Sequence, residues 1–208
     1  MKNIVTISRE FGSGGREIGK RLADELGYKY YDKEIITQIA NETDLDEEYI
    51  RNALHQNLNG KFTLSFGRSF STFNVAQHNT TNMLVAERKI IRQIGEEGRC
   101  VIVGRSADAI LSDLAPFNVF VYADMASKIA RCRNRNEGEG LTDKQLKRLI
   151  LQVDSVRKNH HTLVGGGEWG ARENYDLMIN TGGADVKAIS KSVADYVKKL
   201  FGEVRDGD

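Results

Sequence analysis

The chain has 208 residues, of which 40% are hydrophobic and 28% are charged, and its formal net charge is +1. This composition is ordinary for a soluble globular domain and excludes a fibrous or low-complexity chain. A charge so close to zero provides no general attraction for a nucleic-acid polymer or an anionic membrane. No apolar run approaches the roughly 20 residues that span a bilayer. We therefore expect neither nucleic acid nor membrane as a partner.

The two cysteines, Cys100 and Cys132, fall in a predicted buried strand and a predicted helix. Two isolated cysteines in such positions indicate reduced thiols and not a disulfide framework. The first residues run directly into a predicted strand without a signal-peptide pattern. We expect a cytoplasmic protein.

Short β-type runs alternate with helical patterns, which predicts an α/β fold with a mostly parallel sheet and helices on both faces. The predicted strands are Ile4–Ser8, Tyr28–Tyr31, Cys100–Val103, Asn118–Tyr122 and Leu177–Asn180. The predicted helices are Gly15–Leu26, Lys33–Asn41, Asp46–Leu54, Asn82–Glu97, Ala126–Asn134, Thr142–His161 and Asp185–Phe201.

Two regions interrupt this alternation. Residues 58–73 are rich in Gly, Ser, Thr and Phe and predict a loop or a helical insertion at about 55–80. Their phenylalanines indicate packing of the insertion or, as a second interpretation, a homodimer contact. Residues 134–170 form a polar segment with glycine-rich flanks, as a lid that closes over a ligand requires.

The stretch between the first predicted strand and the first helix is glycine-rich, with Gly12, Ser13, Gly14 and Gly15 followed by Arg16. A strand, a glycine turn and a helix form a cradle for phosphate, because backbone amides and the positive helix end face one small space. A cation at a helix start opposes the helix dipole, which makes sense if an anion binds there. The alternative is a tight strand–helix turn in which Arg9 and Arg16 are merely exposed.

Further arginines follow later strands. Arg105 lies at the carboxyl end of a predicted strand, where open α/β sheets bind their ligands. Its guanidinium suits a phosphate or carboxylate, and the alternative is a salt bridge to Asp108 or Asp113. Arg131 lies on the helix that follows the fourth predicted strand, and Arg157 lies on the predicted lid helix; such residues otherwise form a solvated face.

Other chemistry finds less support. His160 and His161 are adjacent and point in different directions on a helix, so we expect no two-ligand metal site there. Ser8, Ser13 and Ser106 have no evident His or Asp partner, and the sequence predicts no hydrolase triad.

In their order and spacing these motifs resemble the cytidylate kinases, and more closely the cytidylate kinase-like family of P-loop proteins. The resemblance runs from Ile4 to about Leu200. It rests on Gly12-Ser13-Gly14 in the loop, Tyr30-Tyr31-Asp32, Gly104-Arg105 and Asp154-Ser155-Val156-Arg157.

The resemblance implies a P-loop NTPase-type five-stranded parallel sheet in one domain, 1–208, with a small acceptor-side insertion at about 55–80 and a helical lid at about 134–170. It also implies a kinase that binds ATP with Mg²⁺ and transfers the γ-phosphoryl to a cytidylate-like nucleoside monophosphate or another small acceptor, so that the expected partner is a small nucleotide or phosphorylated metabolite. The implied nucleotide-binding residues are Gly12, Ser13, Gly14, Gly15, Arg16 and Glu17. The implied acceptor-binding residues are Asp32, Arg105, Asp154 and Arg157, and the implied catalytic residues are Arg16, Arg131 and Arg157.

The sequence departs from the family pattern at the loop. Gly15 stands at the position of the P-loop lysine, and Arg16 and Glu17 replace the residues that follow it. Arg16 is the expected substitute for the lysine charge, and the metal ligands stay unassigned. The acceptor motif of cytidylate kinases is replaced by residues 33–38, so the acceptor is not specified. A non-catalytic protein that senses a nucleotide or phosphometabolite is the alternative function.

Overall fold

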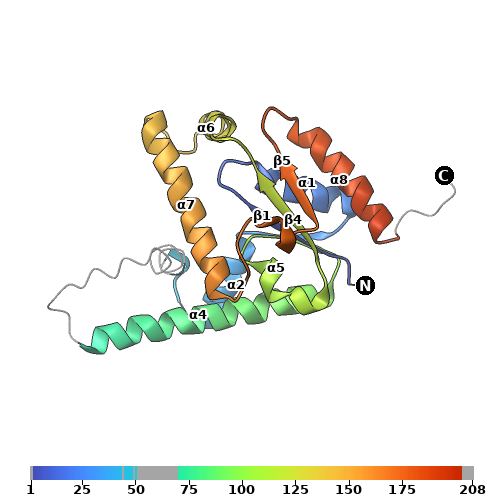
Figure 1. Ribbon diagram of the computed structural model, residues 1–208. Coiled ribbons are helices and arrows are strands. Elements are labelled where there is room, and N and C mark those ends of the chain that lie inside the picture. The colour runs from blue at the N-terminus through green and yellow to red at the C-terminus, as the bar shows by residue number, and fades with distance from the viewer. Residues whose placement is uncertain (1, 44, 49, 51–69, 203–208) are drawn as a thin grey trace.

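The computed structural model describes residues 2–43, 45–48, 50 and 70–202. Its centre is a five-stranded sheet in the order β2-β3-β1-β4-β5 (Figure 1). The strands are β1 (Ile4–Arg9), β2 (Lys29–Tyr31), β3 (Cys100–Val103), β4 (Phe117–Tyr122) and β5 (Leu177–Asn180). Every neighbouring pair is parallel, which confirms the predicted sheet.

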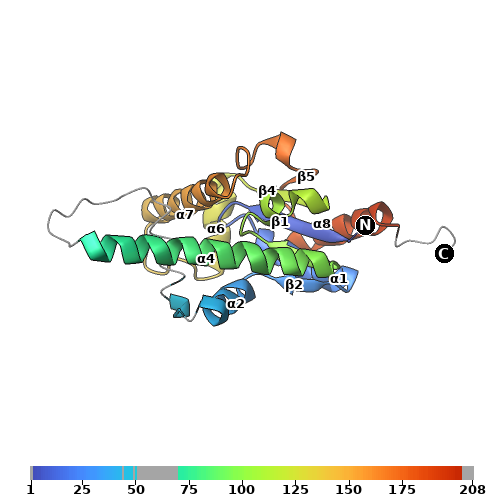
Figure 2. The same cartoon turned by 90° about the horizontal axis from the view of Figure 1, so that it is seen from below.

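Helices cover both faces of the sheet (Figures 1 and 2). On one face α1 (Gly15–Leu26) and α8 (Val186–Leu200) pack against the strands through a buried cluster that includes Ile7, Leu22 and Val197. On the other face lie α2 (Glu34–Thr43), α4 (Phe70–Glu97) and the short α5 (Ala107–Ile110). Because successive side chains of a strand point to opposite faces, β1 contributes to both cores.

A third, smaller cluster belongs to α6 (Met125–Asn134) and α7 (Asp143–Leu163). Leu146 and Ile150 of α7 are fully buried there, and Phe11 from the loop after β1 packs against them. The predicted apolar stripe therefore does hold α7 down. Thr142 caps this helix with a capping box, since its hydroxyl accepts from the amide of Gln145 and the Gln145 side chain accepts from the amide of Thr142.

The predicted strands agree with the structure to within one residue at each end, and α1 matches its predicted bounds. The largest difference is α4, whose start at Phe70 precedes the predicted start by twelve residues, so that residues 70–80 of the predicted insertion belong to this helix. The rest of the insertion and most of the predicted helix at 46–54 lie outside the described residues. Helix α5 was not predicted, because four residues are too few to show helical periodicity.

Candidate active site

The glycine loop joins the central strand β1 to α1. Gly12 and Gly14 have φ values of 76° and 85°, a left-handed conformation that only glycine adopts without strain. The first amides of α1 have no partner within the helix, so the loop and the helix start present hydrogen-bond donors to one space. This backbone conformation is that of the glycine turn expected from the sequence, and its role in phosphate binding remains a prediction.

Side chains from three other elements fasten the loop. Arg131 of α6 donates to the carbonyl oxygen of Gly12 at 2.7 Å and to that of Thr181 at 3.1 Å. The hydroxyl of Thr181 donates to the carbonyl oxygen of Ser13 at 2.7 Å. The amide of Phe11 donates to Asp154 Oδ1 of α7 at 2.6 Å. Arg131 and Asp154 thus contact the loop backbone directly.

Arg9, the last residue of β1, lies between two glycines. A Cβ at Gly15 would approach Arg9 Cβ to 2.5 Å, and a Cβ at Gly104 would overlap the Arg9 guanidinium. The Arg9 side chain therefore fills the space beside Gly15, which the family resemblance places at the lysine position. Sequence reasoning missed Arg9, although a glycine in the first turn of a helix indicates that some other side chain comes close.

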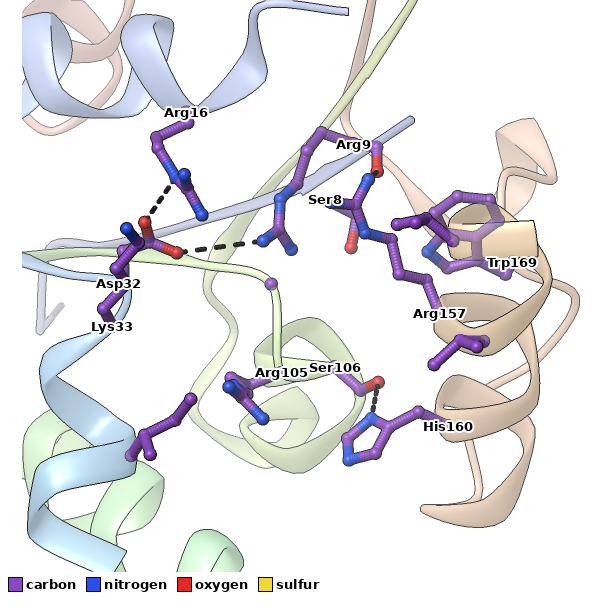
Figure 3. A pocket seen from close by; sticks show the side chains of 14 residues that line it. Ser8, Arg9, Arg16, Asp32, Lys33, Arg105, Ser106, Arg157, His160 and Trp169 are labelled. Atoms are coloured by element: carbon purple, nitrogen blue, oxygen red, sulfur yellow. Dashed lines mark hydrogen bonds and ion pairs between the residues drawn. The ribbon is translucent and has the colours of Figure 1, made fainter. Parts of the chain in front are cut away.

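Two cavities open around this arginine. The smaller, of about 50 Å³, lies at the loop and is lined by Gly12, Gly14 and Gly15 together with Arg135 and neighbouring residues. We call it the loop hollow. The larger, of about 220 Å³, lies below the ends of β1 and β3, and Figure 3 shows its lining side chains. Three residues line both cavities: Arg9, Arg16 and Arg157. We call these three the arginine cluster.

Charges in the larger cavity are mainly positive. Its lining includes the basic residues Arg9, Arg16, Lys33, Arg105 and Arg157 and, among the described residues, the single carboxylate of Asp32. Burial and the neighbouring Arg157 lower the pKa of Arg9, while Asp32 opposes that shift. Burial likewise lowers the pKa of Arg157. Guanidinium groups stay charged in proteins, so an anion bound in the cavity would relieve this crowding.

Arg16 and Asp32 lie at the edge shared by the two cavities. Arg16 Nε is 2.6 Å from Asp32 Oδ2, and Arg9 Nη2 is 3.8 Å from Asp32 Oδ1 (Figure 3). The side chain of Arg16 is half exposed, whereas that of Arg9 is 15% exposed. The alternative in which both arginines are simply exposed is therefore wrong for Arg9.

Four predicted site residues do not line either cavity. Ser13 is completely buried, and its hydroxyl donates to the carbonyl oxygen of Glu10 at 2.8 Å. Glu17 pairs with Arg21 and Arg135 on the surface of α1. Arg131 and Asp154 are bound to the loop backbone, as described above. Burial raises the pKa of Asp154, although Arg157 and the Phe11 amide favour its ionised form. The predicted roles of these residues remain predictions: nucleotide binding for Ser13 and Glu17, acceptor binding for Asp154 and catalysis for Arg131.

Arg105 has a different partner from those considered in the sequence. Its Nη1 lies 3.3 Å from Oε1 of Glu87, a fully buried residue of α4. The alternative salt bridges to Asp108 and Asp113 are wrong, because Asp108 pairs with His161 and Asp113 pairs with Arg92. Spacing along the chain favours near partners, but the turn after β3 faces α4.

The expectation that Ser106 lacks a histidine partner is also wrong. Ser106 Oγ lies 2.8 Å from His160 Nδ1, and His160 Nε2 lies 2.7 Å from Glu87 Oε2. Ser106 and His160 both line the larger cavity. The three residues come from the β3 turn, α7 and α4, so no local motif in the sequence indicates their association.

Trp169 also lines the larger cavity and packs edge-on against Phe120, with ring centroids 5.1 Å apart. Among the described residues no group of three or more His, Cys, Asp or Glu side chains is placed to hold a metal ion. A Mg²⁺ that arrives with nucleotide phosphates needs only one or two protein carboxylates. Asp32 is the carboxylate that faces the larger cavity. In the described part of the chain, no helix is both long and apolar enough to cross a membrane.

The parallel sheet, the glycine loop after its central strand and the arginine-lined cavities define the fold of a P-loop kinase. The family model of the cytidylate kinase-like family matches residues 4–183, and the chain belongs to this family. The resemblance inferred from the motifs is thereby confirmed.

Solved structures agree on the fold. An uncharacterized protein from Eubacterium ventriosum ATCC 27560 is 25% identical, with a TM-score of 0.67 over 94% of this chain and 98% of that one. Shikimate kinase from Bacteroides thetaiotaomicron is 15% identical, with a TM-score of 0.56 over 96% and 98%. Shikimate kinase from Acinetobacter baumannii, in complex with shikimate, is 14% identical, with a TM-score of 0.52 over 98% and 95%. No curated protein matches the sequence.

Proposed function

We propose that this protein is an ATP-dependent phosphotransferase of the nucleotide-kinase type. The donor phosphates bind in the loop hollow, and a small anionic acceptor binds in the larger cavity. The observation that carries this proposal is the arginine cluster, because Arg9, Arg16 and Arg157 line both cavities. Phosphoryl transfer needs positive charge around the migrating group more than it needs covalent chemistry.

In this proposal Arg9 supplies the charge that the P-loop lysine supplies in related proteins. Its side chain is more deeply buried than that of Arg16 and occupies the space over Gly15. Arg16 is held by Asp32 at the rim and has the second role of closing the donor site. ATP is the proposed donor, and Mg²⁺ bound to its phosphates would neutralise charge, with Asp32 as the available protein ligand.

The test compares the wild type with Arg9→Met and Arg16→Ala. We expect Arg9→Met to lower the rate of transfer from radiolabelled ATP by about 10²–10³-fold, the usual effect of losing one transition-state donor. Arg16→Ala should weaken ATP binding in calorimetry and have a smaller effect on the rate. Arg92→Met, which removes surface ion pairs with Asp113 and Glu96, is the matched control.

The alternative function is a sensor that binds a nucleotide or phosphometabolite without transfer. The absence of the P-loop lysine favours it, since Gly15 leaves no room for a side chain beside Arg9. ATP binding with no transfer to any acceptor, by a folded protein with Mg²⁺ present, would establish the sensor. No binding of ATP, ADP or inorganic phosphate would contradict both functions.

A further inference from the structure

A chain of hydrogen bonds runs from the larger cavity to a buried carboxylate. Ser106 Oγ contacts His160 Nδ1 at 2.8 Å, and His160 Nε2 contacts Glu87 Oε2 at 2.7 Å (Figure 3 shows the first of these contacts). Ser106 and His160 line the cavity, while Glu87 is completely buried behind them. A serine, a histidine and a carboxylate in this order are the groups that remove a proton from a hydroxyl.

The hydrogen-bonding roles follow from Glu87. Its burial opposes ionisation, but His160 and Arg105 outweigh it, and the pKa of Glu87 is lowered. An ionised carboxylate only accepts hydrogen bonds, so His160 Nε2 donates to it. In the neutral ring Nδ1 is then an acceptor, and the Ser106 hydroxyl donates to it. Both ring nitrogens of His160 are occupied by hydrogen bonds. Ser106 Oγ is therefore the atom of this hydrogen-bonded series that can contact a ligand.

The position of Ser106 supports a role beyond helix capping. Ser106 is the N-cap residue of α5, yet its side chain makes no capping hydrogen bond. It also has φ 50°, directly after Arg105 at φ 58°, a left-handed conformation that is uncommon for residues other than glycine. A serine at an N-cap position that makes no capping hydrogen bond and has a left-handed backbone conformation indicates a role other than helix capping.

We propose that Ser106, backed by His160 and positioned by Glu87, accepts the proton of an acceptor hydroxyl, and that the acceptor is therefore a small anionic alcohol. This inference rests on the proposed function, which supplies ATP as the donor. The acceptor oxygen attacks the γ-phosphorus, the bond from that phosphorus to the β–γ bridging oxygen breaks, and ADP leaves. The acceptor proton passes to Ser106 Oγ while the Ser106 proton passes to His160 Nδ1, and it is later released to water.

An alcohol needs such a base, whereas a phosphate acceptor does not. The second pKa of a phosphate monoester lies near 6, so its attacking oxygen is already ionised at neutral pH. Asp32 is the carboxylate of the cavity lining that could also accept a proton, but its two oxygens face Arg16 and Arg9. The cavity volume of about 220 Å³ is below the usual 300–1,000 Å³ of drug-sized sites and suits a small metabolite. Its arginines would hold the anionic part of that metabolite.

The proposal is tested with two acceptor panels and radiolabelled ATP, after calorimetry has established ATP binding. The first panel contains anionic alcohols: sn-glycerol 3-phosphate, ribose 5-phosphate and D-glycerate. The second contains phosphate acceptors, CMP and its hydroxyl-free analogue 2′,3′-dideoxy-CMP. Phosphorus NMR of the product distinguishes a phosphomonoester, formed on a hydroxyl, from a phosphoanhydride, formed on a phosphate.

Three variants separate a proton relay from a purely structural link: Ser106→Ala, His160→Gln and the control His161→Gln. We expect the first two to reduce kcat by about 100-fold or more, the usual contribution of a general base. We expect the pH profile of kcat/KM to differ between the wild type and His160→Gln, because the variant lacks the imidazole that takes up the proton. The charged groups facing His160 are Glu87 from α4 and, through Glu87, Arg105 from the β3 turn, and neither variant removes them.

His161→Gln alters the adjacent histidine, which pairs with Asp108 away from the cavity, and should keep the wild-type rate and the wild-type pH profile. A phosphomonoester product together with these effects supports the relay. A phosphoanhydride as the only product, a pH profile of His160→Gln identical to that of the wild type, or bound ATP with no transfer to any alcohol overturns the relay alone. A protein that does not bind ATP overturns the proposed function, and the relay with it.

Discussion

At the scale of single residues, the loop is explained by one arginine. Arg9 ends β1 with its side chain over the end of β3 and the start of α1, and both neighbours in this space are glycines. The absence of a lysine at Gly15 is then a steric consequence of Arg9. Positive charge beside the loop comes from Arg9 at the end of the strand as well as from Arg16 in the helix.

This arrangement predicts that Gly15 does not tolerate a side chain. Alanine normally stabilises a helix by up to about 1 kcal/mol over glycine. Here its Cβ would lie 2.5 Å from Arg9 Cβ, so we expect Gly15→Ala to lower the free energy of unfolding by about 1–3 kcal/mol. Urea denaturation measures the change.

The same experiment in an Arg9→Gly background tests the cause. Removing Arg9 Cβ should relieve the contact, so the double variant should be more stable than the sum of the two single changes predicts. Additive effects would mean that Arg9 does not exclude a side chain at Gly15.

At the scale of elements, α7 has separate contacts on two sides. His160 turns toward the larger cavity and Glu87, whereas His161 turns toward Asp108 of α5 and donates from Nδ1 to the carbonyl oxygen of Gly167. Adjacent residues of a helix are about 100° apart, which is why two neighbouring histidines serve different elements. Nearer the start of the same helix, Asp154 accepts a hydrogen bond from the amide of Phe11 and so joins α7 to the glycine loop.

The His161–Asp108 pair predicts a pH-dependent contribution to stability. Burial lowers the pKa of His161, but the hydrogen bond and charge of Asp108 outweigh this, and its pKa is raised. The contribution is therefore complete below about pH 6.5, the unfolded value, and is lost as pH rises through the folded value. At low pH we expect the free energy of unfolding of the wild type to exceed that of His161→Gln by about 1.5–3 kcal/mol.

Urea denaturation of the wild type, His161→Gln and Asp108→Asn at about pH 5.5 and pH 8.5 tests this on either side of the unfolded histidine value. The difference between wild type and either variant should shrink at the higher pH. A difference that grew with pH would show that the imidazolium is not the stabilising form.

At the scale of the whole molecule, one sheet joins two cores. The core beneath α1 and α8 and the core beneath α2, α4 and α5 lie on opposite faces of the same strands (Figures 1 and 2). Unfolding of either core would expose one face of the sheet against which the other core packs. The cavities lie at the carboxyl edge of this sheet and depend on both cores.

We therefore expect Leu22→Ala and Ile90→Ala, one in each core, to weaken the same unfolding transition. Both side chains are buried, and such truncations usually cost about 2–5 kcal/mol. Circular dichroism reports the helices, and fluorescence of Trp169, the sole tryptophan, reports the cavity. The two signals should change together in each variant, whereas separate transitions would show that the two faces unfold independently.

Much of the fold was predictable because its signals are local. Strand β1, the glycine loop and α1 follow one another within 26 residues, and their apolar periodicity and glycine spacing depend only on neighbouring positions. The buried stripe of α7 was predictable for the same reason. The long start of α4 was not, because its first turns carry few periodic apolar residues.

The sequence by itself determined the alternating architecture, the position of the glycine loop and the arginines near it apart from Arg9. Only the tertiary structure decided which arginine fills the space beside Gly15 and which residues stand behind Ser106. Glu87, Ser106 and His160 are separated by 18 residues or more along the chain, and packing of α4 and α7 against the sheet brings them into contact. Chain spacing carries no record of such contacts, because they arise from how distant elements pack.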